Sequence, residues 1–473
     1  MTGGGGVVGG GVVAGGAVWT IVRHEWRLMR REPVVGWATG LVLAAAVYAL
    51  VGGAAWHDAR LAEVAASHEE GATLLAEQQA AAAEGGEFSG LVGGAKTFIG
   101  LPPGPLAALS VGLADLYPER AEISIFKRPD TLFGRYQLAS PLSLLVGRFD
   151  LGFVVIYLLP LFVLALAYDM LASERDGGTL ALVVMQRVSL PRLLAAKVLA
   201  RWAWLTLLLL ILGAAAFFVG ATGEAGLRVV GWFAVAWLYA SFWLALAAWV
   251  ATLARRPETC AAVLASAWLA AVLVLPGLVD VVAQAASPTP SRLEFVSTVR
   301  AAKNEATKAS AELLATYYHE HPELSANGTQ GGFIPAFYAS EREVERRITP
   351  LLTDYDRRLA EQQRLVDIGR FLSPAVLANE ALVDLAGSGS ERHREVRARA
   401  REFLAAWHAM LAPKIFLGES LRPDDYDQLP RFHFIEPPVA RQRLAGSFLG
   451  LALLTGLAFV LAHRRLLRTS IAD

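Results

Sequence analysis

Cysteine is nearly absent from the sequence, since Cys260 is the only one. A single cysteine excludes an internal disulfide and any cysteine-rich metal cluster. Charged residues are also scarce, at 18% of the chain, whereas soluble domains carry about 25%. The 43 basic and 43 acidic residues cancel, and a nucleic-acid-binding protein would show a basic excess. We therefore expect no nucleic-acid partner and look to lipid as the surrounding medium.

Six long apolar runs dominate the chain. Each has about 20 residues, the length that carries a helix across about 30 Å of hydrocarbon. A helix satisfies its own backbone hydrogen bonds, which is why a bilayer accepts it. The runs cover residues 34–56, 149–171, 198–220, 229–253, 260–282 and 444–462. The predicted fold class is an all-α polytopic membrane protein with six transmembrane helices.

Basic residues next to the runs predict the orientation, because cytoplasmic flanks are enriched in lysine and arginine. Arg31 precedes the first run, Arg187 lies between the second and third, Arg256 lies between the fourth and fifth, and Arg464 follows the sixth. Alternation then places both termini in the cytoplasm. Residues 57–148 and 283–443 are expected to be extracytoplasmic.

Residues 1–33 are expected to form an N-terminal extension and a cytoplasmic interfacial helix. The first 17 residues lack a basic region and a cleavage site, so we interpret them as a disordered extension rather than a signal peptide. Beyond them, Trp19 and Trp26 share one helical face while Arg23 and Arg30 lie on another. Basic amphipathic helices with tryptophan lie against membrane lipid. Proline at position 33 would separate this helix from the first crossing; a plain extension of that crossing is the alternative.

The two outer segments differ in character. In the first, 59–83 is predicted helical, 85–104 is glycine-rich and irregular, and 101–118 is too broken by proline to span. The second, 283–443, is predicted as a mostly helical domain with no sustained strand alternation. Its expected helices cover 291–319, 341–369, a stretch capped by Ser373 and ended by Gly387–Gly389, and a stretch from Ser390 to about Leu411. The sixth crossing and a cytoplasmic tail complete the chain over 444–473.

Candidate chemical sites are weak. The stretch 90–97 is one residue from a phosphate-binding loop, but it lacks the second glycine that lets backbone amides close around phosphate. Imidazole suits copper or zinc, yet His319 and His321 would point apart on a helix, and His393, His408 and His433 have no motif spacing. We therefore expect no metal, no cofactor held by this chain and no enzymatic activity of its own.

The segment after the second crossing, 172–197, carries the most informative motif. It contains Glu174-Arg175-x-x-Gly178-Thr179-Leu180, followed by Ser189 and Lys197. Physically, charges close a helix, a glycine pair turns the chain, and Ser189 caps the helix entering the third crossing. A compact helical turn of this kind can dock into a partner's groove. From charge and glycine alone, a merely solvated loop is the simpler interpretation.

This motif resembles the coupling loop of ABC-2 type permeases, the membrane subunits of ATP-binding-cassette transporters. The resemblance covers the interfacial helix, the six crossings and both cytoplasmic loops. Residues 140–150 also resemble the lead-in of the subgroup with long extracytoplasmic insertions after the first and fifth helices. One departure is Pro191, which lies inside the usual helix start and leaves that start undefined.

The resemblance implies a permease of the bacterial cytoplasmic (inner) membrane. Such a permease pairs with itself or a sister subunit and binds a cytoplasmic dimer of ATPases, which hold ATP and magnesium. The predicted coupling residues are Glu174, Arg175, Asp176, Gly178, Thr179, Ser189 and Arg192. Charge at mid-membrane would mark an ion path, and its scarcity favours export of an apolar or amphipathic substrate. Two alternatives stay open: ATPase-driven mechanotransmission to a periplasmic protein, and a membrane receptor or scaffold.

Overall fold

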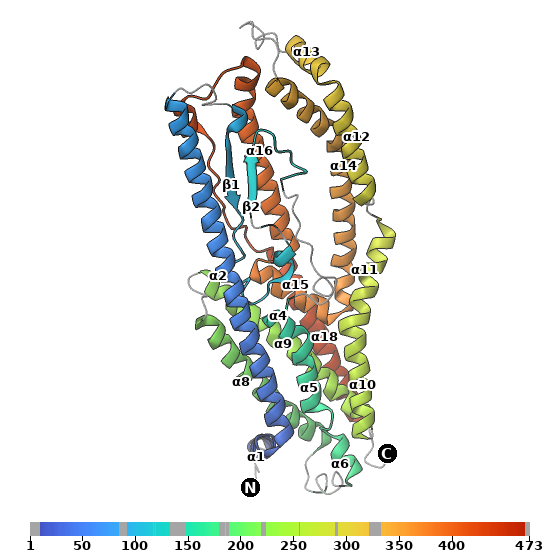
Figure 1. Ribbon diagram of the computed structural model, residues 1–473. Helices are drawn as coiled ribbons and strands as arrows, with labels where there is room; N and C mark the ends of the chain where they lie inside the picture. The colour runs from blue at the N-terminus through green and yellow to red at the C-terminus, as the bar shows by residue number, and fades with distance from the viewer. Residues whose placement is uncertain are drawn as a thin grey trace, which may run out of the picture.

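The computed structural model describes residues 10–84, 92–116, 118, 120–132, 148–178, 185, 189–218, 224–254, 256–288, 292–320 and 333–468. Six of its helices are long and apolar enough to cross a membrane, which confirms the all-α polytopic fold. Helices α1 (Gly10–Arg31) and α6 (Ala172–Asp176) lie at one end of the helix bundle, which we call the base; the strands lie toward the opposite, upper end (Figure 1).

The crossings are arranged around α9 (Glu224–Leu253), which packs against α8 (Leu190–Phe218), α5 (Leu159–Ala167) and α18 (Arg441–Arg468). Three large aromatic side chains of α9, Trp232, Tyr239 and Trp243, are fully buried. A helix buried on so many sides must be apolar around most of its circumference. The remaining crossings are α2 (Pro33–Glu84), the segment from α4 (Leu151–Phe153) to α5, and the segment from α10 (Pro257–Leu269) to α11 (Leu275–Ala286).

The first crossing continues far beyond the bilayer. Helix α2 has 52 residues, so at 1.5 Å per residue it is about 78 Å long, against about 30 Å of hydrocarbon. The sequence predicted a crossing at 34–56 and a helix at 59–83, and both are helical. They form one continuous helix, because the alanine, leucine, glutamate and glutamine residues beyond Trp56 sustain it without a break. Within α2, a Cβ on Gly53 would lie 2.0 Å from the carbonyl oxygen of Ala108, so glycine permits the approach of that loop.

Helix α1 (Gly10–Arg31) begins earlier than expected, since Gly10–Ala17 was predicted to be disordered. It ends at Arg31 and α2 starts at Pro33, so Glu32 separates the two helices. Val22 and Met29 on its inner face are buried, and α1 packs against α8 and α2. The apolar side of α1 around these two residues therefore contacts protein.

Two crossings contain a π-helical turn immediately before a proline. Residues Val154–Leu158 precede Pro160, and Ala270–Val274 precede Pro276. Proline has no N–H, and lipid offers no water to replace the lost hydrogen bond. The hydroxyl of Tyr239 donates to the carbonyl of Ile156 at 3.1 Å. The hydroxyl of Ser373 donates to the carbonyl of Ala271 at 2.6 Å. Hydroxyls from other elements thus satisfy both irregular turns.

A small antiparallel sheet lies beside the upper part of α2. Strand β1 (Lys96–Gly100) pairs with β2 (Arg120–Ser124), with Lys96 opposite Ser124. Residues 85–104 were predicted irregular, which is wrong for β1. Five-residue strands give little alternation to detect, and β1 depends on a distant partner. A Cβ on Gly71 of α2 would lie 2.8 Å from the Thr97 side chain, so glycine lets the strand approach the helix.

The proline-rich stretch before β2 is seated on top of the bundle. The amide of Leu106 donates to the carbonyl of Ala386 at 3.1 Å. Nearby, the indole of Trp232 in α9 donates to the hydroxyl of Ser110 at 3.1 Å, and the amide of Val111 donates to Asp150 at 2.7 Å. This irregular chain therefore has its polar groups paired with both the crossings and the upper helices.

The upper helices differ in detail from those expected. In place of the single helix predicted over 291–319, the structure has two helices, α12 (Arg292–Lys308) and α13 (Ser310–Glu320). The other elements are α14 (Phe333–Gly369), α15 (Pro374–Ala386), α16 (Ser390–Leu417) and α17 (Pro423–Gln428). Helix α14 starts eight residues before the expected position 341. Gly389 rather than Ser390 is the cap of α16, and that helix continues past Leu411 through Pro413.

Helix α15 joins the upper domain to the membrane bundle. Its start and end agree with the sequence: Ser373 accepts a hydrogen bond from the Val376 amide, and Gly387 has φ +72°. Left-handed backbone of this kind favours glycine. Leu382 and Leu385 are buried in the same hydrophobic core as the crossings, and α15 packs against α9 and α18. A segment expected to be wholly outside the bundle thus forms its upper end.

We predict that Ser373→Ala destabilises the protein by about 2 kcal/mol or more. The change removes a helix cap, which is worth about 1 kcal/mol, and leaves the Ala271 carbonyl without its partner, at about 1–3 kcal/mol. Thermal unfolding in detergent measures the loss. Ser390→Ala is the matched control, because Ser390 is not a cap; equal effects of both changes would contradict the role of Ser373.

Asp384, near the end of α15, is buried among charged groups. Burial raises its pKa, and Glu380 and Glu391 raise it further, while Arg443 and Arg370 oppose them. The result is a pKa of about 6, against an ordinary value of 3.8. The folded protein therefore binds this proton more tightly than the unfolded chain, so its contribution is complete below about pH 4 and is lost as the pH rises through about 6.

We predict that this group lowers the free energy of unfolding by about 3 kcal/mol as the pH rises from well below 4 to well above 6, since one pKa unit corresponds to about 1.4 kcal/mol. Asp384→Asn should flatten that part of a plot of melting temperature against pH. Asp367→Asn is the control, because Asp367 also lies beside Arg443, at 3.3 Å. An unchanged slope in Asp384→Asn would refute the assignment.

Candidate functional site

The loop that the sequence singled out leaves the base of the bundle. Helix α6 follows the second crossing and ends at Gly177. Gly178 has φ +66°, a left-handed conformation that glycine adopts without penalty. Thr179 and most of the apolar element after it lie outside the described residues.

Five ionised side chains meet where this loop joins the bundle. Lys197 Nζ lies 2.9 Å from Glu25 and 2.8 Å from Glu174. Arg201 lies 3.1 Å from Glu25 and 3.8 Å from Asp169. We call Glu25, Asp169, Glu174, Lys197 and Arg201 the base cluster. It joins α1, the end of the second crossing, α6 and α8.

The centre of the base cluster is shielded from solvent. The side chains of Glu25, Lys197 and Arg201 are 9%, 7% and 8% exposed. Burial raises the pKa of Glu25, but the attraction of Lys197 and Arg201 outweighs it, so the pKa lies below its ordinary value. An unpaired charge in such a place would cost several kcal/mol. Each ion therefore depends on its partners in other helices.

Arg175, the residue after Glu174, is tied to another crossing. Its guanidinium donates to the carbonyls of Ala251 at 3.0 Å and Ala254 at 2.9 Å, at the end of α9. The last carbonyls of a helix have no partner within it, and a cation there also interacts favourably with the helix dipole. Two adjacent residues of one short helix thus hold α8 and α9.

The other predicted loop residues face outward. Asp176, Gly178, Ser189 and Arg192 are exposed at the base. The carbonyl of Ser189 accepts the amides of Arg192 and Leu193, so α8 begins at Leu190 with Pro191 in its first turn. Proline is tolerated there because first-turn amides have no helical partner. The departure from the expected pattern therefore does not disturb the start of the helix.

The predicted interfacial residues divide into two groups. Arg23 and Arg30 are exposed, and Trp19 is 69% exposed. Trp26 instead packs edge-to-face on Trp204 of α8, with ring centroids 5.1 Å apart. Trp26 is therefore half-buried where α1 rests on α8, whereas Trp19 is exposed.

Residues 292–435 match the family model described as a domain of unknown function (DUF3526). No curated protein matches the chain significantly. The matched segment runs from α12 past α17 in the upper domain, so it does not include the base cluster.

Sequence reasoning missed Glu25, Asp169 and Arg201 as site residues and quoted Lys197 only as part of a pattern. A signal for them exists. Glu25 is an acid on the apolar side of a basic helix, and Lys197 and Arg201 are one turn apart in an otherwise apolar one. Charges in membrane helices are costly unless paired, so the sequence could have predicted that Glu25 pairs with Lys197 and Arg201.

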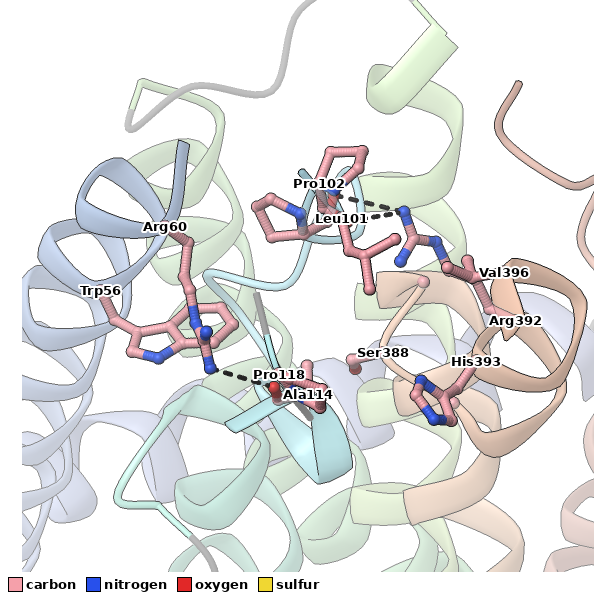
Figure 2. A pocket seen from close by; sticks show the side chains of 13 residues that line it. Trp56, Arg60, Leu101, Pro102, Ala114, Pro118, Ser388, Arg392, His393 and Val396 are labelled. Atoms are coloured by element: carbon pink, nitrogen blue, oxygen red, sulfur yellow. Dashed lines mark hydrogen bonds between the residues drawn. The ribbon is translucent and has the colours of Figure 1, made fainter. Parts of the chain in front are cut away.

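A small hollow lies at the upper end of the bundle, between α2, the proline-rich chain and α16 (Figure 2). Arg60 donates to the Ala114 carbonyl and Arg392 to the Pro102 carbonyl across it. The hollow is about 50 Å³, enough for a few waters at about 10–15 Å³ each but not for an amphipathic molecule. Within the described residues, no three histidine, cysteine, aspartate or glutamate side chains are placed to hold a metal ion.

We predict that Lys197→Met lowers the free energy of unfolding by about 3 kcal/mol, because Glu25 and Glu174 both lose a cation in a shielded site where only Arg201 remains beside Glu25. Arg192→Met is the control on the same helix, since Arg192 is exposed. Adding Glu174→Gln to Lys197→Met should cost less than the sum of the two separate losses, as expected of residues in contact. Strict additivity in thermal unfolding would show that the pair contributes no coupling.

Proposed function

We propose that the chain is the membrane subunit of an ATP-binding-cassette transporter of the ABC-2 type. The base of the bundle would face the cytoplasm of a bacterial inner membrane, where a separate ATPase dimer holding ATP and magnesium docks. The observation that carries the proposal is the attachment of α6: Glu174 binds Lys197 of α8, and Arg175 binds the end of α9. A push on this exposed helix would reach two crossings directly.

The base cluster extends that attachment to a third element. Lys197 also binds Glu25, so α1 is held by the same ammonium group that holds α6. Such ion pairs are directional and break only at high cost in a buried site. We infer that α1, α6 and the lower part of α8 shift as a unit when an ATPase moves the loop.

The second crossing has a place to bend. Its π-helical turn, Val154–Leu158, lies above α5, which leads directly to α6. Prolines and π turns are the usual causes of helix kinks. Tilting of α5 about this turn would change the shape of the lower part of the cargo pathway through the bundle and leave the upper end in place. A second permease subunit, the same chain or a sister, would complete the pathway.

The cargo we propose is apolar or amphipathic. Described residues of α9, the central crossing, include no charged side chain between Arg228 and Leu253. An ion or proton path would require ionisable groups at that depth. The bundle core instead presents aromatic and aliphatic surfaces.

A second candidate function is mechanotransmission to a periplasmic protein, with no cargo crossing. It is favoured by the two crossings that continue into the upper domain. Helix α2 extends to β1, and α11 packs against α14. Stimulation of ATP turnover by a periplasmic extract, with no response to candidate lipids, would favour this function over export.

We predict that Gly178→Ala reduces coupled ATP turnover several-fold while membrane insertion is unchanged. Alanine in left-handed backbone costs about 1 kcal/mol or more, so the turn that presents the loop must rearrange. Gly177→Ala is the matched control, because Gly177 has φ −77°, a conformation that alanine adopts freely. Glu174→Gln should likewise uncouple turnover.

The measurement uses the chain co-expressed with the P-loop ATPase encoded nearest to it, purified together and reconstituted in lipid. Equal turnover in Gly178→Ala and Gly177→Ala would count against the loop as the coupling element. Failure of any ATPase to purify with the unaltered chain would remove the proposal and leave the receptor or scaffold.

A further inference from the structure

An apolar groove runs along the lower part of the bundle between α8, α9 and α18. Its volume is about 550 Å³. Its lining includes Leu194, Val198, Trp202, Trp237, Phe459 and His463. Because all three helices are membrane-spanning by length and composition, the groove opens sideways toward lipid rather than toward water.

The polar atoms of the groove wall are already paired. The indole of Trp202 donates to Ser241 at 3.1 Å, and that of Trp237 donates to Thr206 at 3.0 Å. The hydroxyl of Ser241 donates to the Trp237 carbonyl at 2.8 Å. These groups therefore offer no free hydrogen to an occupant, and the wall presents aromatic and aliphatic surface. A hydrocarbon chain fits such a wall, and a polar molecule would lose its hydration without replacement.

The end of the groove at the base is basic. His463 lines it and is exposed. Arg192 lies just outside the lining and is exposed, on the side of α8 that also carries the lining residues Ala195 and Leu199, three and seven residues further on. Neither α8 nor α18 contains an aspartate or glutamate. Lys197, by contrast, is engaged in the base cluster on another side of α8. The mouth is therefore complementary to an anion.

We propose that this groove binds one acyl chain of an anionic phospholipid from the leaflet at the base, with its phosphate at Arg192 and His463. The inference does not require that the chain be a transporter subunit. The lipid would lie against the same turns of α8 that the base cluster holds from another side. It would thereby fill the space into which α8 could otherwise lean.

The experiment compares phosphatidylglycerol with phosphatidylcholine of identical acyl chains. The purified full chain is incubated with either lipid, stripped with detergent, and its retained lipid counted by native mass spectrometry. We expect about fivefold more phosphatidylglycerol to be retained, since one basic residue near a phosphate contributes about 1 kcal/mol. Ala195→Phe fills the groove and should abolish this retention; Ala214→Phe, exposed on the same helix outside the groove lining, should not.

A second variant changes the charge at the mouth of the groove and leaves its apolar wall unaltered. Arg192→Gln should erase the preference for phosphatidylglycerol while some chain binding persists. Arg192 is exposed, so this change leaves the packing of α8 intact. Equal retention of both lipids by the unaltered chain would overturn the proposal that the bound lipid has an anionic headgroup. Equal retention of phosphatidylglycerol by Ala195→Phe and Ala214→Phe would overturn the groove as the site. A change of oligomeric state in Ala195→Phe, without a change in lipid count, would instead make the groove an interface between copies and overturn the lipid assignment.

Discussion

The ion pair between Lys197 and Glu25 is the contact on which the lower half of the molecule depends. Both side chains are nearly inaccessible to solvent, so each needs partners of opposite charge, and Arg201 and Glu174 supply the others. Because they belong to α8 and α1, their pairing fixes an N-terminal helix that would otherwise have only an amphipathic surface to position it. The same lysine then binds Glu174, which makes the orientation of α6 depend on the placement of α1.

The upper half obeys a related constraint on backbone groups. A proline in a crossing leaves a carbonyl without a partner, and lipid cannot supply one. Within the bundle, the hydroxyl of Tyr239 donates to such a carbonyl. In the other crossing, the donor is the hydroxyl of Ser373, at the junction with the upper domain. Ser373 is at the same time the cap of α15. A single hydroxyl therefore connects the start of a helix in one part of the protein to an irregular turn in another, and this fixes the height at which the upper domain rests on the bundle.

The crossings were predictable because length and hydrophobicity are local properties of a sequence. The cap at Ser373 and the end at Gly387 were predictable for the same reason, since both belong to their own helix. The strands were not, because Lys96 pairs with Ser124 far along the chain. The base cluster was predictable only in part. The loop motif indicated Glu174, but which residues pair with it depends on how α1 and α8 pack. The continuity of α2 was missed because a change from apolar to polar composition was taken as the end of a helix, although polar residues such as glutamate and glutamine form helices as readily.

Helix α9 connects these constraints over the depth of the bundle. At the base its last carbonyls accept Arg175, at mid-depth Tyr239 supports the π turn of the second crossing, and at the top Trp232 holds Ser110. Energetic coupling between distant sites requires an element with two discrete arrangements that both sites can bias. The π turn beside Tyr239 is suited to be that element, because an extra residue in a helical turn can be accommodated by a change in local hydrogen bonding without unfolding the crossing. A displacement of α6 would act on this turn from two directions, through α5 in the same chain segment and through α9 by way of Arg175, whereas Ser110 and its neighbours would hold the upper end of α9 fixed.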